Sequence, residues 1–381
     1  MKLRSYASVP VFLCSICVGL LSAGPASAQV KRWGLVDLVP TAVAGLSEPV
    51  LIEAGNANGY ATESNGTVKA WGSRKDGAPG DERNKSSESA VTVTLPAGVK
   101  GRALGEAERS GFVATTTGEV YDWGDNKNGD LCQGPQETPI STPRKIEGLT
   151  EVLAVQGAEH NVMFLLASGE VMVCGWNNEG QIGLPATVRE ATAPTLVLGL
   201  KHVVELSAGP KVSAVRTESG EVLTTGTNRG GQLGLGTGIK KSFGFTRVSL
   251  PGPASEISVG GDGKQNSHSF ALIGGIPYGW GVDEYGEVGD GSTASKYTPV
   301  VASELTMLGA LKEVRAGGHS SAVLTEAGVV ETLGGNEAGE LGVGERGPSF
   351  GPLPVESEVI ELSVTARIDL VRRGASASAS R

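Results

Sequence analysis

The glycine-rich stretch at residues 220–236, GEVLTTGTNRGGQLGLG, carries a spacing that recurs along the whole chain. Gly220 is followed by a glycine six, eleven and fourteen residues later. The same spacing begins at Gly66, Gly118, Gly169, Gly275 and Gly328, and only Cys132 departs from it. The second glycines of successive sets lie 52, 51, 51, 55 and 53 residues apart. A period of this length indicates one supersecondary unit repeated along the chain, with neighbouring units completing each other's core.

Each unit is predicted to be a four-stranded antiparallel sheet. A short apolar run such as 162–166 or 269–273 precedes the first glycine and is typical of a buried strand. A tight hairpin follows, for which Asn65-Gly66 is suited because both residues tolerate left-handed backbone. The alternating strand at 120–123 then leads through an Asn- and Gly-rich loop to a proline-containing segment, and proline fits an outer edge strand.

The two ends of the chain are predicted to share a seventh sheet. Residues 359–363, VIELS, resemble residues 203–207, VVELS, which begin an earlier unit. Residues 30–34, VKRWG, resemble the Trp-Gly strand of the other units. Small sheets of this kind hide their edges by radial packing as propeller blades, and joining the ends would close the ring.

The residues also carry a family resemblance. Residues 120–131 and 222–236 resemble the repeat of the regulator of chromosome condensation family, V-x-x-W-G-x-N-x-x-G-Q-L-G-x-G. The resemblance covers about residues 30–373 and implies an all-β, seven-bladed β-propeller closed by both termini. Because one fold hosts many functions, it says less about what the protein does.

Three segments are expected. Residues 1–28 have a basic start at Lys2 and Arg4, an apolar stretch at 9–21 and the A-x-A pattern at 26–28, which is typical of a secretory signal. The propeller is predicted over 29–373, and residues 374–381 form a tail predicted to be disordered. No later stretch is long and apolar enough to insert into a membrane. We therefore expect a periplasmic or extracellular protein.

Net charge and cysteine content limit the classes of partner and of site that can be expected. Removal of residues 1–28 leaves 30 basic and 41 acidic residues and a formal net charge of −11. An acidic protein repels nucleic acid and anionic lipid, so neither is expected as a partner. Cys132 and Cys174 remain, and an oxidising compartment would allow them to pair, but the sequence leaves this open. Two cysteines alone do not make a zinc site.

No catalytic, cofactor or metal site is expected. Residues 347–351 fit G-x-S-x-G, but prolines around them replace the strand and helix of a nucleophile elbow. His160, His268 and His319 recur at similar positions of their units. A ring of imidazoles at the central channel is one interpretation, and side chains that bond local backbone are the favoured one. The acidic residues show no spacing that stands out from solvated loops.

Aromatic residues outside the repeat pattern are the candidate partner-binding residues: Trp176, Phe243, Phe245, Tyr285, Tyr297 and Phe350. Aromatic side chains on a rigid disc serve as anchors for a protein partner, although they could also pack under their own loops. The favoured function is therefore an exported, monomeric, non-enzymatic protein-binding scaffold. The alternatives are an exported enzyme acting on a glycan or another extracellular substrate, a guanine nucleotide exchange factor, and an inhibitor like the propeller-type β-lactamase inhibitor protein.

Overall fold

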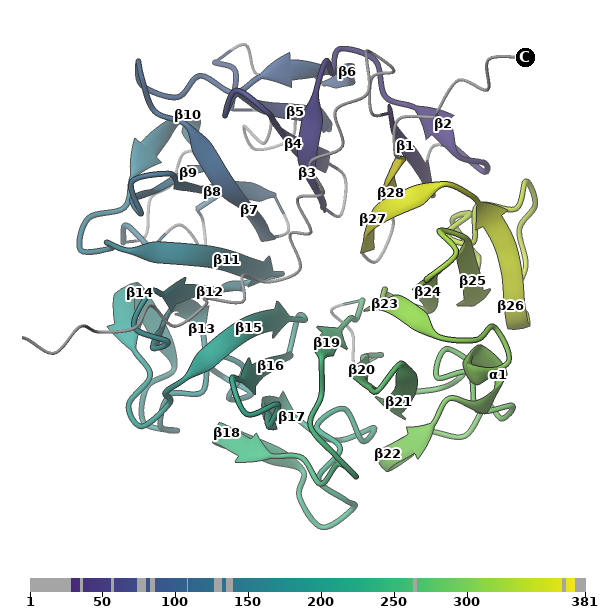
Figure 1. The fold of residues 1–381 in the computed structure, drawn as a ribbon. Coiled ribbons are helices and arrows are strands. Elements are labelled where there is room, and N and C mark those ends of the chain that lie inside the picture. The colour runs from purple at the N-terminus through teal and green to yellow at the C-terminus, as the bar shows by residue number, and fades with distance from the viewer. Residues whose placement is uncertain are drawn as a thin grey trace, which may run out of the picture.

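The computed structural model describes residues 29–373 except 35–36, 56–57, 74–79, 83–85, 108, 127–131, 135–139, 263–265 and 365–367. The predicted signal at 1–28 and the predicted tail at 374–381 lie outside the described residues. Within the described part, the chain forms seven four-stranded antiparallel sheets arranged as a ring (Figure 1). The predicted all-β, seven-bladed propeller is confirmed.

Blades 1 to 3 come first in the chain. Their strands, from the centre of the ring outward, are β3 (Pro49–Ala54), β4 (Asn58–Glu63), β5 (Val68–Gly72) and β6 (Ser87–Thr92) in blade 1; β7 (Gly101–Ala107), β8 (Ser110–Thr115), β9 (Val120–Gly124) and β10 (Ile140–Lys145) in blade 2; and β11 (Val152–Ala158), β12 (Asn161–Leu166), β13 (Val171–Trp176) and β14 (Glu190–Leu196) in blade 3.

Blades 4 to 6 repeat this order. Their strands are β15 (Val203–Ala208), β16 (Val212–Thr217), β17 (Val222–Thr227) and β18 (Lys241–Arg247) in blade 4; β19 (Glu256–Val259), β20 (His268–Ile273), β21 (Ile276–Gly281) and β22 (Lys296–Val301) in blade 5; and β23 (Leu311–Ala316), β24 (Ser320–Thr325), β25 (Val330–Gly334) and β26 (Ser349–Glu356) in blade 6.

Blade 7 joins the two ends of the chain, as predicted. It consists of β27 (Val359–Val364), β28 (Ile368–Arg373), β1 (Gln29–Gly34) and the short β2 (Thr41–Ala42). β1 pairs with β28 along its whole length, from Gln29 opposite Arg373 to Gly34 opposite Ile368. The first and last strands of the ring therefore lie side by side (Figure 1).

One short helix, α1 (Ser303–Thr306), interrupts the otherwise all-strand structure between β22 and β23. The sequence analysis expects no helix there. The turn forms because the backbone N–H groups of Leu305 and Thr306 both bond to the carbonyl of Ala302, which buries Leu305 completely.

The second strand is buried along nearly its whole length in blades 1 to 6, as its apolar sequence predicts. In β8, for example, every residue is buried. The fourth strand is the most exposed, and the prolines predicted for an edge lie in β10, β14 and β22. Each of these three strands pairs with its neighbour through a register shift, which accommodates a residue that cannot donate to the ladder.

The core lies between blades, and the fourth glycine of the repeat explains how blades approach each other. Trp33 of blade 7 and Trp280 of blade 5 are fully buried, and their Nε1 groups donate to the carbonyls of Glu340 and Gln232 in the preceding blade. A Cβ at Gly342 would lie 2.7 Å from Trp33. Gly342 has left-handed backbone (φ +68°) and lies so close to Trp33 that no side chain fits there. Both features require glycine at this position.

Candidate functional site

Five of the six candidate aromatic residues lie at the same end of their blades, and Phe245 lies within β18. Trp176 ends the third strand of blade 3, and Tyr285 lies in the loop between the third and fourth strands of blade 5. Phe243, Tyr297 and Phe350 lie near the start of a fourth strand. Successive inner strands run in one direction, so this end of every blade belongs to one face of the disc, which we call the glycine-loop face.

Three of these residues occupy one structural position in consecutive blades. Phe243, Tyr297 and Phe350 each follow the residue that pairs with the last glycine of the third strand. Each packs its backbone against a glycine in the loop of the preceding blade, and a Cβ on that glycine would lie 3.2, 2.8 and 3.4 Å from the three Cα atoms, respectively. Phe350 is 55% exposed, and the other two are partly buried.

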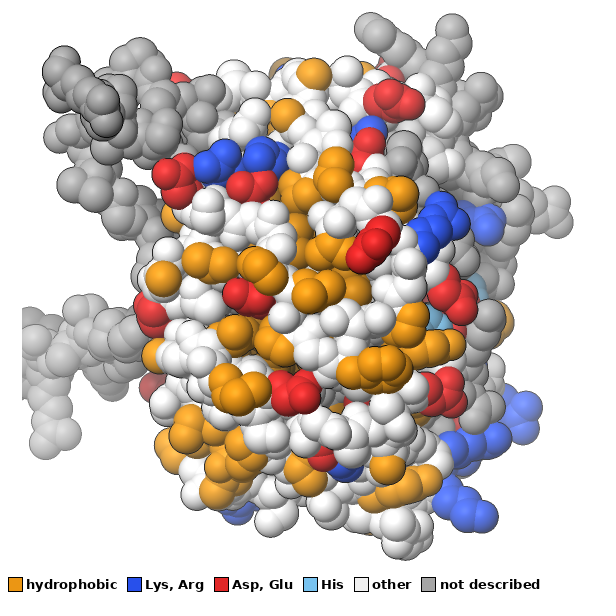
Figure 2. All heavy atoms as spheres, turned by 90° about the vertical axis from the view of Figure 1, so that its right-hand side faces the viewer, with side chains coloured by type: hydrophobic (Ala, Val, Ile, Leu, Met, Phe, Trp, Pro, Cys, Tyr) orange, Lys and Arg blue, Asp and Glu red, His pale blue; other side chains and the backbone are white. Residues whose placement is uncertain are grey.

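The side of the disc that carries β26 is rich in apolar surface. Figure 2 shows hydrophobic side chains distributed over this side, with single acidic and basic side chains between them. We call Phe243, Tyr297 and Phe350 together the aromatic rim. Phe350 of β26 adds an exposed aromatic ring to this side, and aromatic residues are enriched at protein interfaces.

The other three candidates are held by their neighbours. Trp176 contacts His160 with ring centres 4.4 Å apart and planes tilted by 45°, and Tyr285 meets His319 edge to face at 5.6 Å. Phe245 fills the seam between blades 3 and 4, where a Cβ at Gly183 would lie 2.5 Å from its ring. Thus the sequence-based alternative, in which such aromatics pack under loops, describes Phe245 best.

The three recurring histidines do not form a ring at the channel. None of them is among the residues that line the central cavity. His319 Nε2 lies 3.0 Å from Asp262 Oδ2 of the preceding blade, and this hydrogen bond raises the pKa of His319 to about 10. The side chains of His268 and His319 thus bond side chains of neighbouring blades, where the sequence analysis favoured local backbone partners.

His268 and Ser321 lie together without forming a nucleophile and its base. Ser321 Oγ donates to the carbonyl of Glu287 at 2.7 Å, so His268 Nε2, 2.8 Å away, must donate to Ser321 Oγ. Burial lowers the pKa of His268 to about 4, which keeps the ring neutral. Because the hydroxyl proton points away from the imidazole, this arrangement does not activate the serine.

The G-x-S-x-G segment is also structural. Ser349 begins the outer strand β26, and its Oγ donates to the carbonyl of Gly351 at 2.7 Å. Across the residues that the structure describes, no three His, Cys, Asp or Glu side chains are grouped to hold a metal ion. The described helix is too short to span a membrane, and no other helix in this part of the chain could do so.

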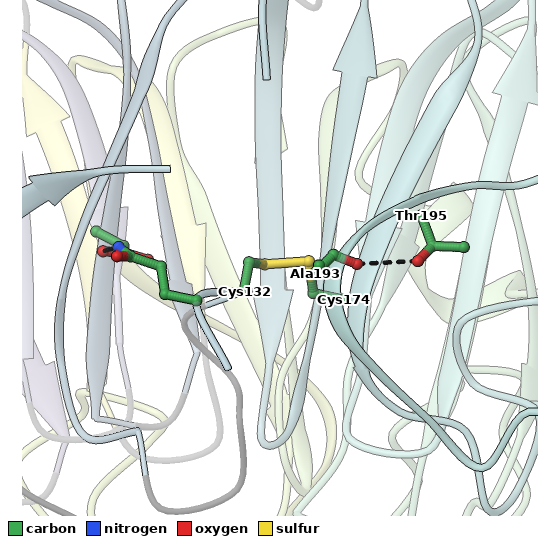
Figure 3. The surroundings of a disulfide bond; sticks show 6 residues. Cys132, Cys174, Ala193 and Thr195 are labelled. Atoms are coloured by element: carbon green, nitrogen blue, oxygen red, sulfur yellow. Dashed lines mark hydrogen bonds between the residues drawn. A yellow bond between two sulfur atoms is a disulfide. The ribbon is translucent and has the colours of Figure 1, made fainter. Parts of the chain in front are cut away.

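Cys132 and Cys174 form a disulfide between blades 2 and 3 (Figure 3). Cys132 occupies the fourth-glycine position and keeps its left-handed backbone, with φ +57° against +68° at Gly342. Cys174 occupies the position that Trp33 and Trp280 hold in other blades. The pair therefore replaces the Trp-over-Gly contact by a covalent bond, with the Cα atoms 5.5 Å apart.

The inner strands enclose a central cavity of about 300 Å³. Among the described residues, its wall carries seven carboxylates and two guanidinium groups: Glu53, Glu106, Glu159, Glu205, Glu256, Glu313, Glu361, Arg102 and Arg315. These glutamates lie up to 308 residues apart in the chain, and the curvature of the ring brings them together.

A family model describes part of this repeat. The regulator of chromosome condensation (RCC1) repeat matches residues 117–165 and 168–215, which form much of blades 2 to 4. The chain thus carries repeats of the regulator of chromosome condensation type.

Relatives in this repeat family are much longer than the matched region. The probable E3 ubiquitin-protein ligase HERC6 of Homo sapiens is 31% identical over 261 residues, which is 65% of this chain and 25% of HERC6. The regulator of chromosome condensation of Drosophila melanogaster is 34% identical over 178 residues, 46% of this chain and 31% of that protein. This chain therefore corresponds to a third or less of either relative.

A solved propeller of the family confirms the likeness in fold. The Saccharomyces cerevisiae protein Prp20p superposes with a TM-score of 0.77 at 18% identity and covers 92% of both chains. The structure was described together with the binding of Prp20p to Gsp1p and histones.

Reasoning from the repeat of this family missed the carboxylates of the central wall. The signal was present, because the match between residues 203–207 and 359–363 includes Glu205 and Glu361 at the same position. That match served only to find the seventh blade. Glu256 and Glu313 occupy the same position in blades 5 and 6, but their neighbours differ enough to hide the pattern.

Proposed function

We propose that this chain is a non-enzymatic, exported scaffold that binds another protein through the glycine-loop face and the aromatic rim. The observation that carries the proposal is the placement of Phe243, Tyr297 and Phe350 at one structural position in three consecutive blades. A row of aromatic groups on a stiff base loses little conformational entropy on binding, and such groups are common at interface hot spots.

The family supports a binding role. The related propeller Prp20p is described with binding to Gsp1p and histones. Those partners belong to Prp20p, and the acidic character of the present chain favours a partner with a neutral or basic surface. The name of HERC6 describes it as a probable ligase, but this chain matches only a quarter of that protein. The name therefore gives no support for ligase activity in this chain.

Two observations support export. Residues 1–28 have the composition of a secretory signal, and Cys132 is joined to Cys174 by a disulfide. Structural disulfides persist in oxidising compartments and are rare in the cytosol of mesophiles.

Pull-down experiments with the mature chain test the binding role. The wild-type protein should recover a stoichiometric partner from the medium or periplasm of its host, and the purified partner should rebind in titration. Phe350→Ser should weaken that titrated affinity at least about tenfold, because it removes an exposed aromatic anchor worth about 1.4 kcal/mol or more. Loss of binding should come without loss of folding, since Phe350 is 55% exposed.

Leu198→Ser is the matched control. Leu198 is 85% exposed but lies in the link between blades 3 and 4, at the opposite end from the glycine-loop face. It should leave the affinity unchanged. Equal affinity of the wild type and the Phe350→Ser variant would contradict the assignment of the surface. Turnover of a glycan or acyl substrate that depends on one carboxylate would contradict the non-enzymatic role.

Export has a separate test. The full chain, expressed in its host, should leave the cytoplasm and begin at Gln29 when its N-terminus is sequenced. Recovery of an uncleaved, cytoplasmic chain would contradict export and leave the binding role to be judged by the titration.

A further inference from the structure

Glutamate and serine side chains join neighbouring inner strands at the channel wall. Glu205 Oε1 accepts the backbone N–H of Ile257 at 3.3 Å, and Ser207 Oγ accepts that of Val259 at 2.8 Å. Both acceptors belong to blade 4 and both donors to blade 5. The pair of side chains thus supplies hydrogen bonds to an inner strand that has no further strand to pair with on that side.

The same two contacts recur at two more seams. They join Glu256 to Val314 N–H (2.9 Å) and Ser258 to Ala316 N–H (2.9 Å) between blades 5 and 6, and Glu361 to Ile52 N–H (3.2 Å) and Ser363 to Ala54 N–H (2.9 Å) between blades 7 and 1. The last pair lies where the ring closes. Carboxylates therefore serve as connectors at three seams.

The seam between blades 6 and 7 uses basic groups instead. Lys312 Nζ donates to the carbonyl of Ile360 at 2.7 Å, and Arg315 Nε donates to that of Leu362 at 3.3 Å. The other end of Arg315 bonds the carboxylates of Glu256 and Glu313, the latter at 3.0 Å. One guanidinium thus serves two carboxylates and a backbone carbonyl.

Arginines compensate the remaining carboxylates only in part. Glu205 has its own Arg216, and Glu361 has its own Arg372, each with Nε 2.6 Å from a carboxylate oxygen. Glu53 on β3 is not paired with an arginine of its own among the residues that the structure describes. It hydrogen-bonds Gln156 on β11, and it faces the negative charge of Glu361 and the positive charge of Arg315.

The other charged residues of the channel wall do not neutralise these carboxylates. β7 contributes Arg102 and Glu106, and Glu159 follows β11. Burial, with the charge of Glu361 added, raises the pKa of Glu53 to about 8. Burial together with Glu256 raises the pKa of Glu205 and of Glu313 to about 7, and burial raises the pKa of Glu361.

We propose that the channel wall is a proton-operated clasp, which holds the inner strands together more tightly as the surroundings change from mildly alkaline to mildly acidic. Three of the six connecting N–H groups are accepted by carboxylates, and these carboxylates are crowded around too few arginines. Neutralising Glu53 removes repulsion from this cluster without removing a connection, because Glu53 accepts none of the six connecting N–H groups.

The direction of the effect follows from proton linkage. A glutamate in an unfolded chain titrates near pH 4.3, so between about pH 4.3 and pH 8 the folded protein binds more protons at these sites than the unfolded chain. Stability from these sites is present in full at the acidic end of that window and is lost as the pH rises through it. His268 and His319 also have shifted pKa values and contribute to the pH dependence of stability. The test therefore compares the wild type with variants instead of relying on the pH dependence of the wild type alone.

Thermal unfolding of the wild type and of Glu53→Gln at pH 5 and pH 8.5 tests the clasp. Gln keeps an acceptor for Gln156 and removes the charge. The melting temperatures should agree within about 1 °C at pH 5, and the variant should melt at least about 3 °C higher at pH 8.5. Glu221→Gln on the exposed surface should parallel the wild type at both values.

A second variant separates repulsion from connection. Glu361→Gln removes a carboxylate that accepts the Ile52 N–H and pairs with Arg372, so it should lower the melting temperature at both pH values. Parallel curves for the wild type and Glu53→Gln would overturn the proposal, as would a uniform decrease for Glu53→Gln.

Carbon-13 NMR of glutamate carboxyl groups keeps the proposal testable if Glu53→Gln does not fold. At least one glutamate of the wild-type protein should titrate above pH 6, well outside the ordinary range. Titration of every glutamate below pH 5.5 would overturn the clasp.

Discussion

The two sides of the ring close their seams by different chemistry. In blades 4 to 7 the third residue of the inner strand, or its equivalent, is Glu205, Glu256, Glu313 or Glu361. The same register position in blades 1 to 3 is taken by Leu51, Ala103 and Ala154. By this position alone we call blades 4 to 7 the charged side and blades 1 to 3 the apolar side, since Glu53, Arg102 and Glu106 of blades 1 and 2 also line the cavity.

The apolar side has a connection that the charged side lacks. The disulfide between Cys132 and Cys174 joins blades 2 and 3 beside a core of buried apolar groups that includes Phe112 and Phe164. A repeat can thus satisfy the same geometrical demand, a tight seam between wedge-shaped sheets, by covalent and apolar contacts or by hydrogen-bonded charges. Only the second kind responds to pH.

The largest effect should come from Arg315→Met. This change leaves the carboxylates of Glu256 and Glu313, which are 7% and 6% exposed, without their shared cation. Removing one partner of a buried ion pair costs about 3–5 kcal/mol. Denaturant unfolding at pH 8 should show a loss of this size, with a smaller loss at pH 5, where the glutamates take up protons.

Arg247→Met is the control for that change. Arg247 pairs with Glu221 on an outer strand, where the two side chains are 70% and 42% exposed, so its loss should be barely measurable. Equal losses of stability for Arg315→Met and Arg247→Met would contradict the claim that ion pairs at the channel wall contribute more to stability than ion pairs at the surface.

The disulfide should contribute somewhat less to the free energy of unfolding than Arg315 does. Replacing Cys132 and Cys174 together by serine should lower the free energy of unfolding by about 2–4 kcal/mol, because the cross-link restricts the unfolded chain. Unlike the Arg315 variant, this one should lose the same amount at pH 5 and pH 8, as measured by denaturant unfolding.

A second pair of substitutions sharpens this prediction. Cys132→Gly with Cys174→Trp installs the contact that Gly342 and Trp33 make at another seam. It should recover more than half of the stability lost in the double serine variant. No recovery would mean that the seam between blades 2 and 3 differs from the others by more than the pair of cysteines.

The smallest effect is expected for Ser363→Ala. The change removes the acceptor of the Ala54 N–H at the closing seam and should cost about 1–2 kcal/mol. Ser219→Ala, in an exposed turn, should cost nothing measurable. A Ser363→Ala variant as stable as the wild type would show that the closing seam depends on the pairing of β1 with β28 alone.

Much of the fold could be predicted from the sequence because its signals are local. The hairpin at Gly66 forms with φ +86°, as the Asn65-Gly66 pair indicates, and Asn65 Oδ1 accepts the N–H of Thr67. The seventh blade was also predictable, since Trp33-Gly34 repeats a pattern whose partner strand lay at the other end of the chain.

The candidate site was predictable only in part. The six aromatic residues could be singled out, but the common end of the disc that five of them share and the equivalence of Phe243, Tyr297 and Phe350 depend on strand register. Phe245 lies on an outer strand, but its ring fills the seam between blades 3 and 4. The space is available because blade 4 has Thr225 at the position where blades 5 and 7 have tryptophan.

By itself the sequence determined the repeat, the number of blades and the closure by the two ends, because glycine spacing and apolar runs act over a few residues of backbone. The tertiary structure decided that Cys132 meets Cys174, that His319 pairs with Asp262 and that six inner-strand glutamates share one cavity. Those contacts join residues 42 to 308 positions apart, and only the curvature of a closed ring sets their distances.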